Sequence, residues 1–191
     1  MSVALCLVQD LEFIMAGQQM SSVFDSCSIP SSSVVSFKKY DVFLSFHNED
    51  TRSTFTSHLY AALSRSIVLT FIDDNELKKG DEISPAFIEA IEESRVSIVI
   101  FSENYASSKW CLNELKKIQE CKKFMEQIVI PVFYKIDPLH MKKQTGSYKK
   151  TFEKHMRDLK NDNDKLQKLQ KWKDALTEAA SLGGWNSQNY R

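Results

Sequence analysis

Short apolar runs rich in β-branched residues alternate along this chain with longer stretches whose apolar positions recur every three or four residues. The runs have the length and composition of buried strands and lie at residues 41–46, 67–72, 96–101 and 128–134. The intervening stretches predict helices at residues 51–65, from Pro85 onward behind a Ser84 cap, and at residues 108–126, 147–159 and 164–181. Strands that alternate with helices pair in parallel and are covered on both faces, so the pattern predicts an α/β fold with a flavodoxin-like, doubly wound parallel sheet.

One carboxylate lies on the apolar face of the helix predicted at residues 108–126. At about 100° per residue, Glu114 falls in the same arc as five apolar side chains, namely Cys111, Leu115, Ile118, Cys121 and Met125. Removing water from a carboxylate costs several kcal/mol or more unless the group is paired or opens onto a cleft. Two interpretations remain open: a buried partner such as Tyr or Arg, or an active-site carboxylate near the carboxyl end of a strand.

Other common chemical motifs are absent from the sequence. It contains no GxGxxG or Walker loop, no GxSxG elbow, and no HExxH or other close spacing of its four histidines, so we predict no metal site. A response-regulator receiver needs an aspartate at the end of the third strand, where this chain has Phe101 and Ser102. That class of protein is therefore excluded.

The charge of the chain favours neither nucleic acid nor an anionic membrane. Its formal net charge is zero and its pI is about 6.9. All 25 basic residues lie at or after Lys38, where 22 acidic residues leave a net charge of +3. The four cysteines are scattered, which predicts reduced thiols in the cytosol.

Residues 1–37 differ in composition from the rest of the chain. They lack Lys and Arg, and residues 21–36 contain eight serines. We expect a disordered Ser-rich leader, with residues 5–15 forming at most a fraying helix. A transit peptide is the alternative, but its characteristic arginines are missing.

Several short sequence blocks occur along the chain in the same order as in a known protein family. They are YDVFLSF at 40–46, EDTR at 49–52, TFIDD at 70–74, ISP at 83–85, IEES at 91–94, NYASS at 104–108, WCL at 110–112, EL at 114–115, PVFY at 131–134 and KQTGS at 143–147. This series closely resembles plant TIR (Toll/interleukin-1 receptor/resistance protein) domains over residues 38–185. The resemblance implies five strands, of which the sequence pattern places four, and a short C-terminal tail at residues 186–191.

The resemblance also implies an activity. Plant TIR domains hydrolyse the nicotinamide–ribose bond of NAD, and the family's catalytic glutamate aligns with Glu114. A carboxylate suits this chemistry because loss of nicotinamide leaves an oxocarbenium-like ribose. The family's cofactor-binding loop aligns with six consecutive residues and one later glycine: His47, Asn48, Glu49, Asp50, Thr51, Arg52 and Gly80.

Four positions depart from the family pattern. His47 replaces an arginine, which weakens a phosphate contact, and Asn48 replaces a glycine but tolerates positive φ. Ile67 replaces another glycine, so the turn before the second strand is predicted to differ. Lys78 replaces a frequent glutamate in the loop that ends at Gly80.

The family resemblance finally implies partners. Ser57 and His58 match a Ser-His pair through which family members associate helix to helix. We therefore expect an NAD glycohydrolase of plant defence signalling that uses NAD or NADP as substrate, is activated by association with other TIR domains, and acts in the cytoplasm or additionally in the nucleus. The alternative is a catalytically weak adaptor that binds other TIR domains. The chain ends where the family commonly continues, so a TIR-only protein and a truncated receptor are both open.

Overall fold

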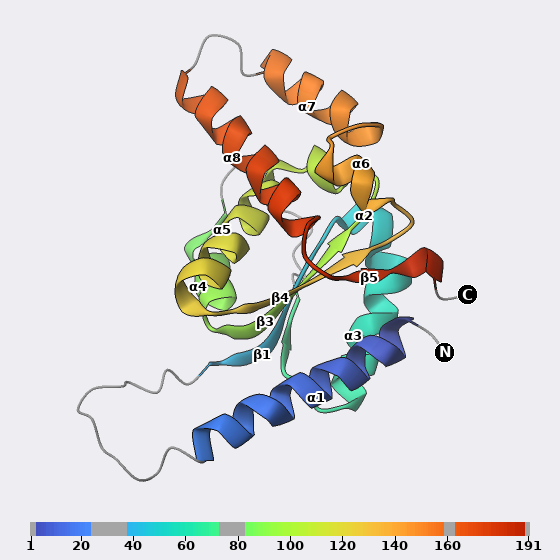
Figure 1. Ribbon diagram of the computed structural model, residues 1–191, viewed down its shortest axis with the longest axis vertical. Helices are drawn as coiled ribbons and strands as arrows, with labels where there is room; N and C mark the ends of the chain where they lie inside the picture. The colour runs from blue at the N-terminus through green and yellow to red at the C-terminus, as the bar shows by residue number, and fades with distance from the viewer. Residues whose placement is uncertain (1–2, 24–37, 73–82, 159–162, 190–191) are drawn as a thin grey trace, which may run out of the picture.

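The computed structural model describes residues 3–23, 38–72, 83–158 and 163–189. A five-stranded sheet forms its centre, in the order β2-β1-β3-β4-β5, and every neighbouring pair of strands is parallel (Figure 1). The strands are β1 (Tyr40–Phe46), β2 (Thr70–Phe71), β3 (Ser94–Phe101), β4 (Ile128–Phe133) and β5 (Trp185–Asn186). The predicted doubly wound parallel sheet is thus confirmed.

Helices cover both faces of this sheet, as Figure 1 shows. On one face lie α4 (Pro85–Glu92), α5 (Lys109–Met125) and α8 (Asn163–Ala179), and on the other lie α1 (Val3–Val23) and α3 (Ser57–Arg65). The short α6 (Pro138–Lys142) and α7 (Ser147–Asp158) follow β4 and pack with α8. Each face has its own cluster of buried apolar side chains, because parallel strands present alternate residues to opposite sides.

The alternation in β1 decides what lies beneath α5. Val42, Leu44 and Phe46 join the cluster under α1 and α3, while Phe43 joins the cluster under α4 and α5. Ser45 has the same parity as Phe43 and is fully buried. A hydroxyl is therefore placed on the α5 side of the sheet, near the carboxyl end of β1.

Helix α5 begins and ends where local chemistry predicts. The Ser108 hydroxyl accepts a hydrogen bond from the backbone N–H of Cys111 at 3.2 Å, which makes Ser108 the N-cap. The helix ends at Glu126, which takes a left-handed conformation with φ of 55°. The predicted inward face is buried except for Met125, which is 44% exposed because the helix has run past the edge of the core there.

The helix predicted at residues 51–65 is divided into three segments. They are α2 (Asn48–Thr51), the π-helical segment η1 (Arg52–Thr56) and α3. Threonine side chains compete with the helical backbone at the break, because Thr54 Oγ1 donates to the Thr51 carbonyl and Thr56 Oγ1 donates to Thr51 Oγ1. The wider π-turn leaves the buried Thr51 beside the carboxyl end of β1.

The N-terminal segment corrects the prediction of a disordered leader. Residues 3–23 form α1, in which Ala4, Leu7, Val8 and Leu11 are buried at helical spacing against the cluster that contains α3. Serine richness begins only at residue 21, so the composition of residues 21–36 was wrongly extended to this amphipathic stripe. Residues 24–37 lie outside the described ranges. Among the described helices, none is long and apolar enough to cross a membrane.

The turn between α3 and β2 corrects a second prediction. Ile67 does adopt a positive φ, of 58°, and its side chain is 92% exposed. The backbone N–H of Val68 donates to the Leu63 carbonyl, and that of Ile67 donates to the Ser64 carbonyl, which is the Schellman pattern that ends helices. The buried Leu63 and Val68 anchor both ends of the turn, so the chain keeps this geometry although isoleucine is strained in it.

Replacing Ile67 with glycine is expected to stabilise the protein by about 1 kcal/mol. Relief of roughly 1–2 kcal/mol of left-handed strain exceeds the entropic cost of glycine, roughly 0.5–1 kcal/mol. Thermal unfolding measures the change, and Ile67→Ala is the matched control because it removes the exposed side chain but keeps a Cβ. If the alanine variant gains as much as the glycine variant, backbone strain is not the cause.

The fifth strand is short and crosses the predicted domain boundary. Trp185 and Asn186 pair with Val132 and Phe133 of β4, so the boundary drawn after residue 185 falls inside β5. Gly184 permits this pairing, because a Cβ there would clash with the Pro131 carbonyl oxygen. The backbone N–H of Lys135 donates to Ser187 Oγ at 2.9 Å and ties the following residues to the sheet.

Candidate functional site

Glu114 is buried at the carboxyl end of the sheet, with 4% of its surface exposed. Ser45 of β1 donates its hydroxyl proton to Glu114 Oε2 at 2.8 Å, and the indole N–H of Trp110 donates to Oε1 at 2.7 Å. Each carboxylate oxygen therefore has a neutral donor within hydrogen-bonding distance. These contacts fix the carboxylate against rotation and offset part of the cost of its burial.

A tyrosine extends this arrangement behind Ser45. The Tyr105 hydroxyl lies 2.9 Å from Ser45 Oγ and 3.1 Å from the Cys111 carbonyl oxygen. Burial, reinforced by the negative charge of Glu114, raises the pKa of Tyr105, so the phenol stays protonated and can act as a donor. Tyr105, Ser45 and Glu114 thus form a connected chain of polar groups inside an apolar core.

Trp110 is itself held by aromatic packing. Its ring lies edge-on to Phe87, with ring centroids 5.1 Å apart, and Phe87 in turn contacts Phe71. Edge-to-face aromatic pairs are worth roughly 0.5–1.5 kcal/mol beyond their buried area. The indole N–H is therefore aimed at Glu114 by residues from α4 and β2.

The nearby cysteine is not a candidate nucleophile. The Cys111 thiol donates to the Phe46 carbonyl oxygen at 3.5 Å and is 4% exposed. Burial, reinforced by the negative charge of Glu114, raises its pKa well above the usual value. A thiol in this state is a poor source of thiolate.

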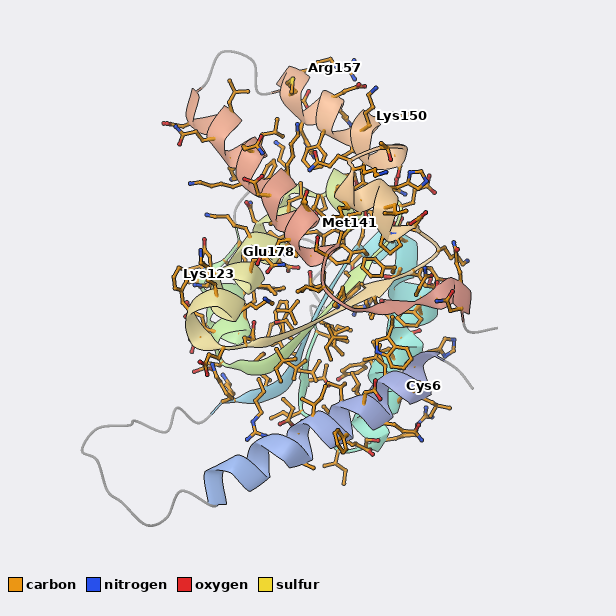
Figure 2. All side chains as sticks on the ribbon, in the orientation of Figure 1. Cys6, Lys123, Met141, Lys150, Arg157 and Glu178 are labelled. Atoms are coloured by element: carbon orange, nitrogen blue, oxygen red, sulfur yellow. The ribbon has the colours of Figure 1, made fainter. Side chains whose placement is uncertain are left out.

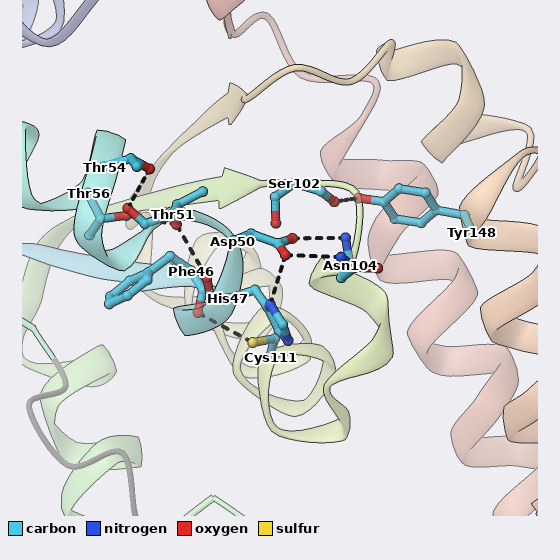
Figure 3. Close-up of polar contacts among 10 residues, drawn as sticks. All are labelled: Phe46, His47, Asp50, Thr51, Thr54, Thr56, Ser102, Asn104, Cys111 and Tyr148. Atoms are coloured by element: carbon cyan, nitrogen blue, oxygen red, sulfur yellow. Dashed lines mark hydrogen bonds and ion pairs between the residues drawn. The ribbon is translucent and has the colours of Figure 1, made fainter.

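The loop after β1 is organised around Asp50 (Figure 3). Its carboxylate accepts hydrogen bonds from the backbone N–H of Asn104 at 2.9 Å and from Asn104 Nδ2 at 3.0 Å. Burial of Asp50 raises its pKa, but the polar groups of Ser102 and Asn104 outweigh burial and leave the pKa below its usual value. Asp50 therefore ties the β1–α2 loop to the β3–α5 loop as an anion.

His47 lies against this carboxylate. Its Nδ1 is 3.4 Å from Asp50 Oδ1, and the side chain is 13% exposed (Figure 3). The position where the family resemblance implies an arginine is thus occupied by a largely buried imidazole that faces Asp50.

The remaining residues predicted for this loop occupy different environments. Thr51 is buried and its hydroxyl donates to the His47 carbonyl at 3.3 Å, whereas Glu49 is exposed. Arg52 lies over the Phe46 ring at 5.6 Å. Asn48 begins α2 and is not among the described residues with positive φ. The tolerance of asparagine for positive φ is therefore not needed at this position.

The other predicted site residues fall into two groups. Gly80, together with Lys78 and the rest of its loop, lies outside the described residues. Ser57 and His58 are exposed on α3, where Ser57 Oγ donates to the Thr54 carbonyl at 2.9 Å. They face outward and do not contact Glu114, as a surface for association requires.

Sequence reasoning missed the residues that position Glu114. Trp110 precedes Glu114 by four residues, so helical spacing was a usable signal for that contact. Ser45 and Tyr105 carried no such signal, because Ser45 is 69 residues from Glu114 in the chain. The hydrogen-bond donors that the structure places on Glu114 are a serine and a tryptophan, with a tyrosine one step behind the serine.

Comparison with known proteins agrees with this fold. The family model described as "TIR domain" matches residues 39–191. The chain is 53% identical over 154 residues to TMV resistance protein N of Nicotiana glutinosa, covering 81% of this chain and 13% of that protein. It is 48% identical over 166 residues to disease resistance protein RPV1 of Vitis rotundifolia, covering 87% of this chain and 11% of that protein.

A solved structure has the same fold. The TIR domains of the activated Roq1 resistosome, which directly recognises the pathogen effector XopQ, superpose with a TM-score of 0.73 at 49% identity. The match covers 79% of this chain and 89% of that one. The curated relatives are much longer, however, and the chain spans only 11% and 13% of the two named above.

Proposed function

The chain belongs to the TIR domain family, and from this premise we propose that it hydrolyses the bond between nicotinamide and ribose in NAD, with Glu114 as the catalytic carboxylate. The observation that carries the proposal is the buried Glu114 side chain, held by Ser45 and Trp110 at the carboxyl end of a parallel sheet. Open α/β sheets bind ligands at this edge. The proposed substrates are NAD and NADP, and the reaction needs no further cofactor.

The proposed reaction places positive charge next to Glu114. Cleavage of the glycosidic bond leaves its electron pair on nicotinamide and an oxocarbenium-like cation on ribose. A fixed carboxylate stabilises that cation, and the effect is larger in a partly desolvated site than in water. Water then adds to the ribose and releases a proton, so the products are nicotinamide and ADP-ribose.

The hydrogen bonds to Glu114 have a role in this scheme. Ser45 and Trp110 orient the carboxylate before the substrate binds, so little reorganisation is needed as charge develops. Tyr105 supports Ser45 and is therefore a positioning residue.

Incubation of the concentrated protein with NAD, followed by chromatographic separation of the products, tests the proposal. Nicotinamide and an ADP-ribose product should appear in equal amounts. A concentrated, demonstrably folded and self-associated sample that leaves NAD intact would refute the hydrolase.

Replacing His47 with arginine is expected to lower the Michaelis constant for NAD about tenfold or more. An arginine here would supply a charge-assisted hydrogen bond to a substrate phosphate, worth roughly 1.5–3 kcal/mol. Steady-state kinetics with NAD and NADP measure the change. His47→Gln is the matched control because it keeps a hydrogen-bonding side chain without a charge, and an unchanged constant in His47→Arg means that position 47 does not contact phosphate.

We further propose that the activity depends on assembly with other TIR domains, in plant immune signalling in the cytoplasm. Two observations support this proposal: the similarity to the TIR domains of the Roq1 resistosome, and the exposure of Ser57 and His58 on α3. Relatives named for disease resistance support the setting.

Replacing His58 with alanine is expected to weaken self-association and NAD turnover together, each by about tenfold. The reason is that an exposed histidine of the proposed helix-to-helix contact is lost, while the fold is unaffected because the side chain is not buried. Analytical ultracentrifugation and turnover over a dilution series measure both quantities. Tyr60→Ala, which removes another exposed α3 side chain, is the control, and constant activity per molecule down to the monomer would contradict the prediction.

The second candidate function is a TIR adaptor with little or no turnover. It is favoured by one observation, the largely buried imidazole of His47 where the family has arginine. NAD turnover distinguishes the two candidates. An adaptor binds other TIR domains through α3 but leaves NAD intact, and the substitution His47→Arg does not create turnover in it.

A further inference from the structure

Three lysines line one depression on the side of the molecule away from α1. Lys109, from the first turn of α5, and Lys150 and Lys154, from α7, border a cavity of about 390 Å³. Figure 2 marks Lys150 on α7. Lys150 and Lys154 are four residues apart and so lie on one face of the helix. Asp158 also lines the depression, which leaves a net charge of +2 when His155 is neutral.

His155 lines the same depression and has an unmet hydrogen-bonding atom. The side chain is 4% exposed, and its Nε2 lies 2.9 Å from the carbonyl oxygen of Ala106. A carbonyl oxygen only accepts, so Nε2 must carry the proton. In the described part of the chain, Nδ1 has no hydrogen-bond partner, although buried polar atoms normally have one.

These groups specify the chemistry of a ligand. The lysines favour negatively charged oxygens, and the start of α5 adds N–H groups with the same preference. With its Nε2 proton donated to Ala106, the imidazole of His155 needs a hydroxyl donor at Nδ1. A phosphomonoester satisfies both requirements, because its second pKa is about 6 and it carries acidic oxygens and an exchangeable P–OH near neutral pH.

We propose that this depression, which we call the α5–α7 site and which is lined by Lys109, Lys150, Lys154 and His155, binds a phosphomonoester. It is separate from the Glu114 cluster. The helical turn η2 (Tyr105–Ser107) lies between them, since Ala106 bonds His155 while Tyr105 reaches Ser45. The proposal therefore does not depend on NAD hydrolysis.

Two-dimensional amide NMR with inorganic phosphate as the probe, at constant ionic strength, tests the site. Saturable shifts are expected at Ser107, Lys109 and residues 150–155, with millimolar affinity. Sulfate is the matched anion, because it has the same shape and charge without a P–OH, and should bind at least several-fold more weakly. Shifts confined to residues 47–52, no saturable shift, or equal affinity for sulfate would each overturn the proposal.

Charge-removing variants locate the binding. The double variant Lys150→Gln, Lys154→Gln should weaken phosphate binding at least tenfold. The double variant Lys143→Gln, Lys149→Gln removes the same charge from exposed positions outside the depression and should leave the affinity unchanged. Glu114→Gln should also bind phosphate as the parent does, so failure of the NAD hydrolase and failure of this site are distinguishable. Equal weakening in the two double variants, or loss of binding in Glu114→Gln, contradicts the α5–α7 site.

The phosphomonoester can be free in solution or part of a lipid headgroup, and vesicles separate the two sources. Sedimentation is measured with phosphatidylcholine vesicles that contain or lack phosphatidylinositol 4-phosphate. Sedimentation only with the phosphorylated lipid, lost in Lys150→Gln, Lys154→Gln, assigns the site to a headgroup. No sedimentation with either vesicle, together with binding of inorganic phosphate, assigns it to a free phosphomonoester.

Discussion

Replacing Glu114 with glutamine is expected to reduce NAD cleavage about a thousandfold or more while the protein stays folded. Glutamine has the same shape but no charge, so it cannot stabilise the cationic ribose. Its carbonyl oxygen can still accept from Ser45, whereas its NH₂ group would meet the Trp110 N–H, donor against donor. The stability change is therefore limited to about 1 kcal/mol for the lost hydrogen bond.

The control for this experiment is on the same helix. Glu120→Gln removes a carboxylate whose partner is Lys116 on the surface, at 3.4 Å, and should leave turnover unchanged. Turnover per folded molecule is measured for parent and both variants at one concentration. Equal rates for Glu114→Gln and the parent would show that Glu114 is a buried structural carboxylate and not the catalytic group.

Replacing Leu11 with alanine is expected to destabilise the protein by about 3 kcal/mol. Leu11 is fully buried between α1 and the apolar cluster that includes Leu59 and Leu63, and large-to-small changes at such sites cost roughly 2–5 kcal/mol. Denaturant unfolding measures the change. Leu7, also fully buried, should behave in the same way.

Phe13 provides the matched control on α1. It is 82% exposed, so Phe13→Ala should change stability by no more than about 0.5 kcal/mol. If Leu11→Ala and Phe13→Ala had equally small effects, α1 would not be docked on the sheet, and the earlier prediction of a mostly disordered leader with a fraying helix at residues 5–15 would be restored.

The fold class could be predicted from the sequence because its signals are local. Residues 98–101 are a continuous apolar run, which is typical of a strand covered on both faces. The inward face of α5 followed from helical geometry, and so did the conclusion that Glu114 needs a partner.

The sequence pattern did not predict β5, the buried face of α1 or the backbone conformation of Ile67, because the local signals for these features are weak. Strand β5 has only two residues and exists because Gly184 lets the chain approach Pro131. In α1, a short apolar stripe is followed by a serine-rich stretch, and only the surface offered by α3 shows that the stripe is buried. The intrinsic preference of isoleucine disfavours a positive φ at Ile67, but the buried Leu63 and Val68 at the two ends of the turn hold the backbone in that conformation.

The sequence by itself therefore determined the parallel α/β architecture and singled out Glu114 as a carboxylate on a core-facing stripe. The tertiary structure alone decided that Ser45, backed by Tyr105, holds that carboxylate, and that Asp50 faces Asn104. The physical reason is one of range. Periodicity and burial act over one or two helical turns and are written in neighbouring residues, whereas a hydrogen bond depends on a distance of about 3 Å between atoms that the chain can place 69 residues apart.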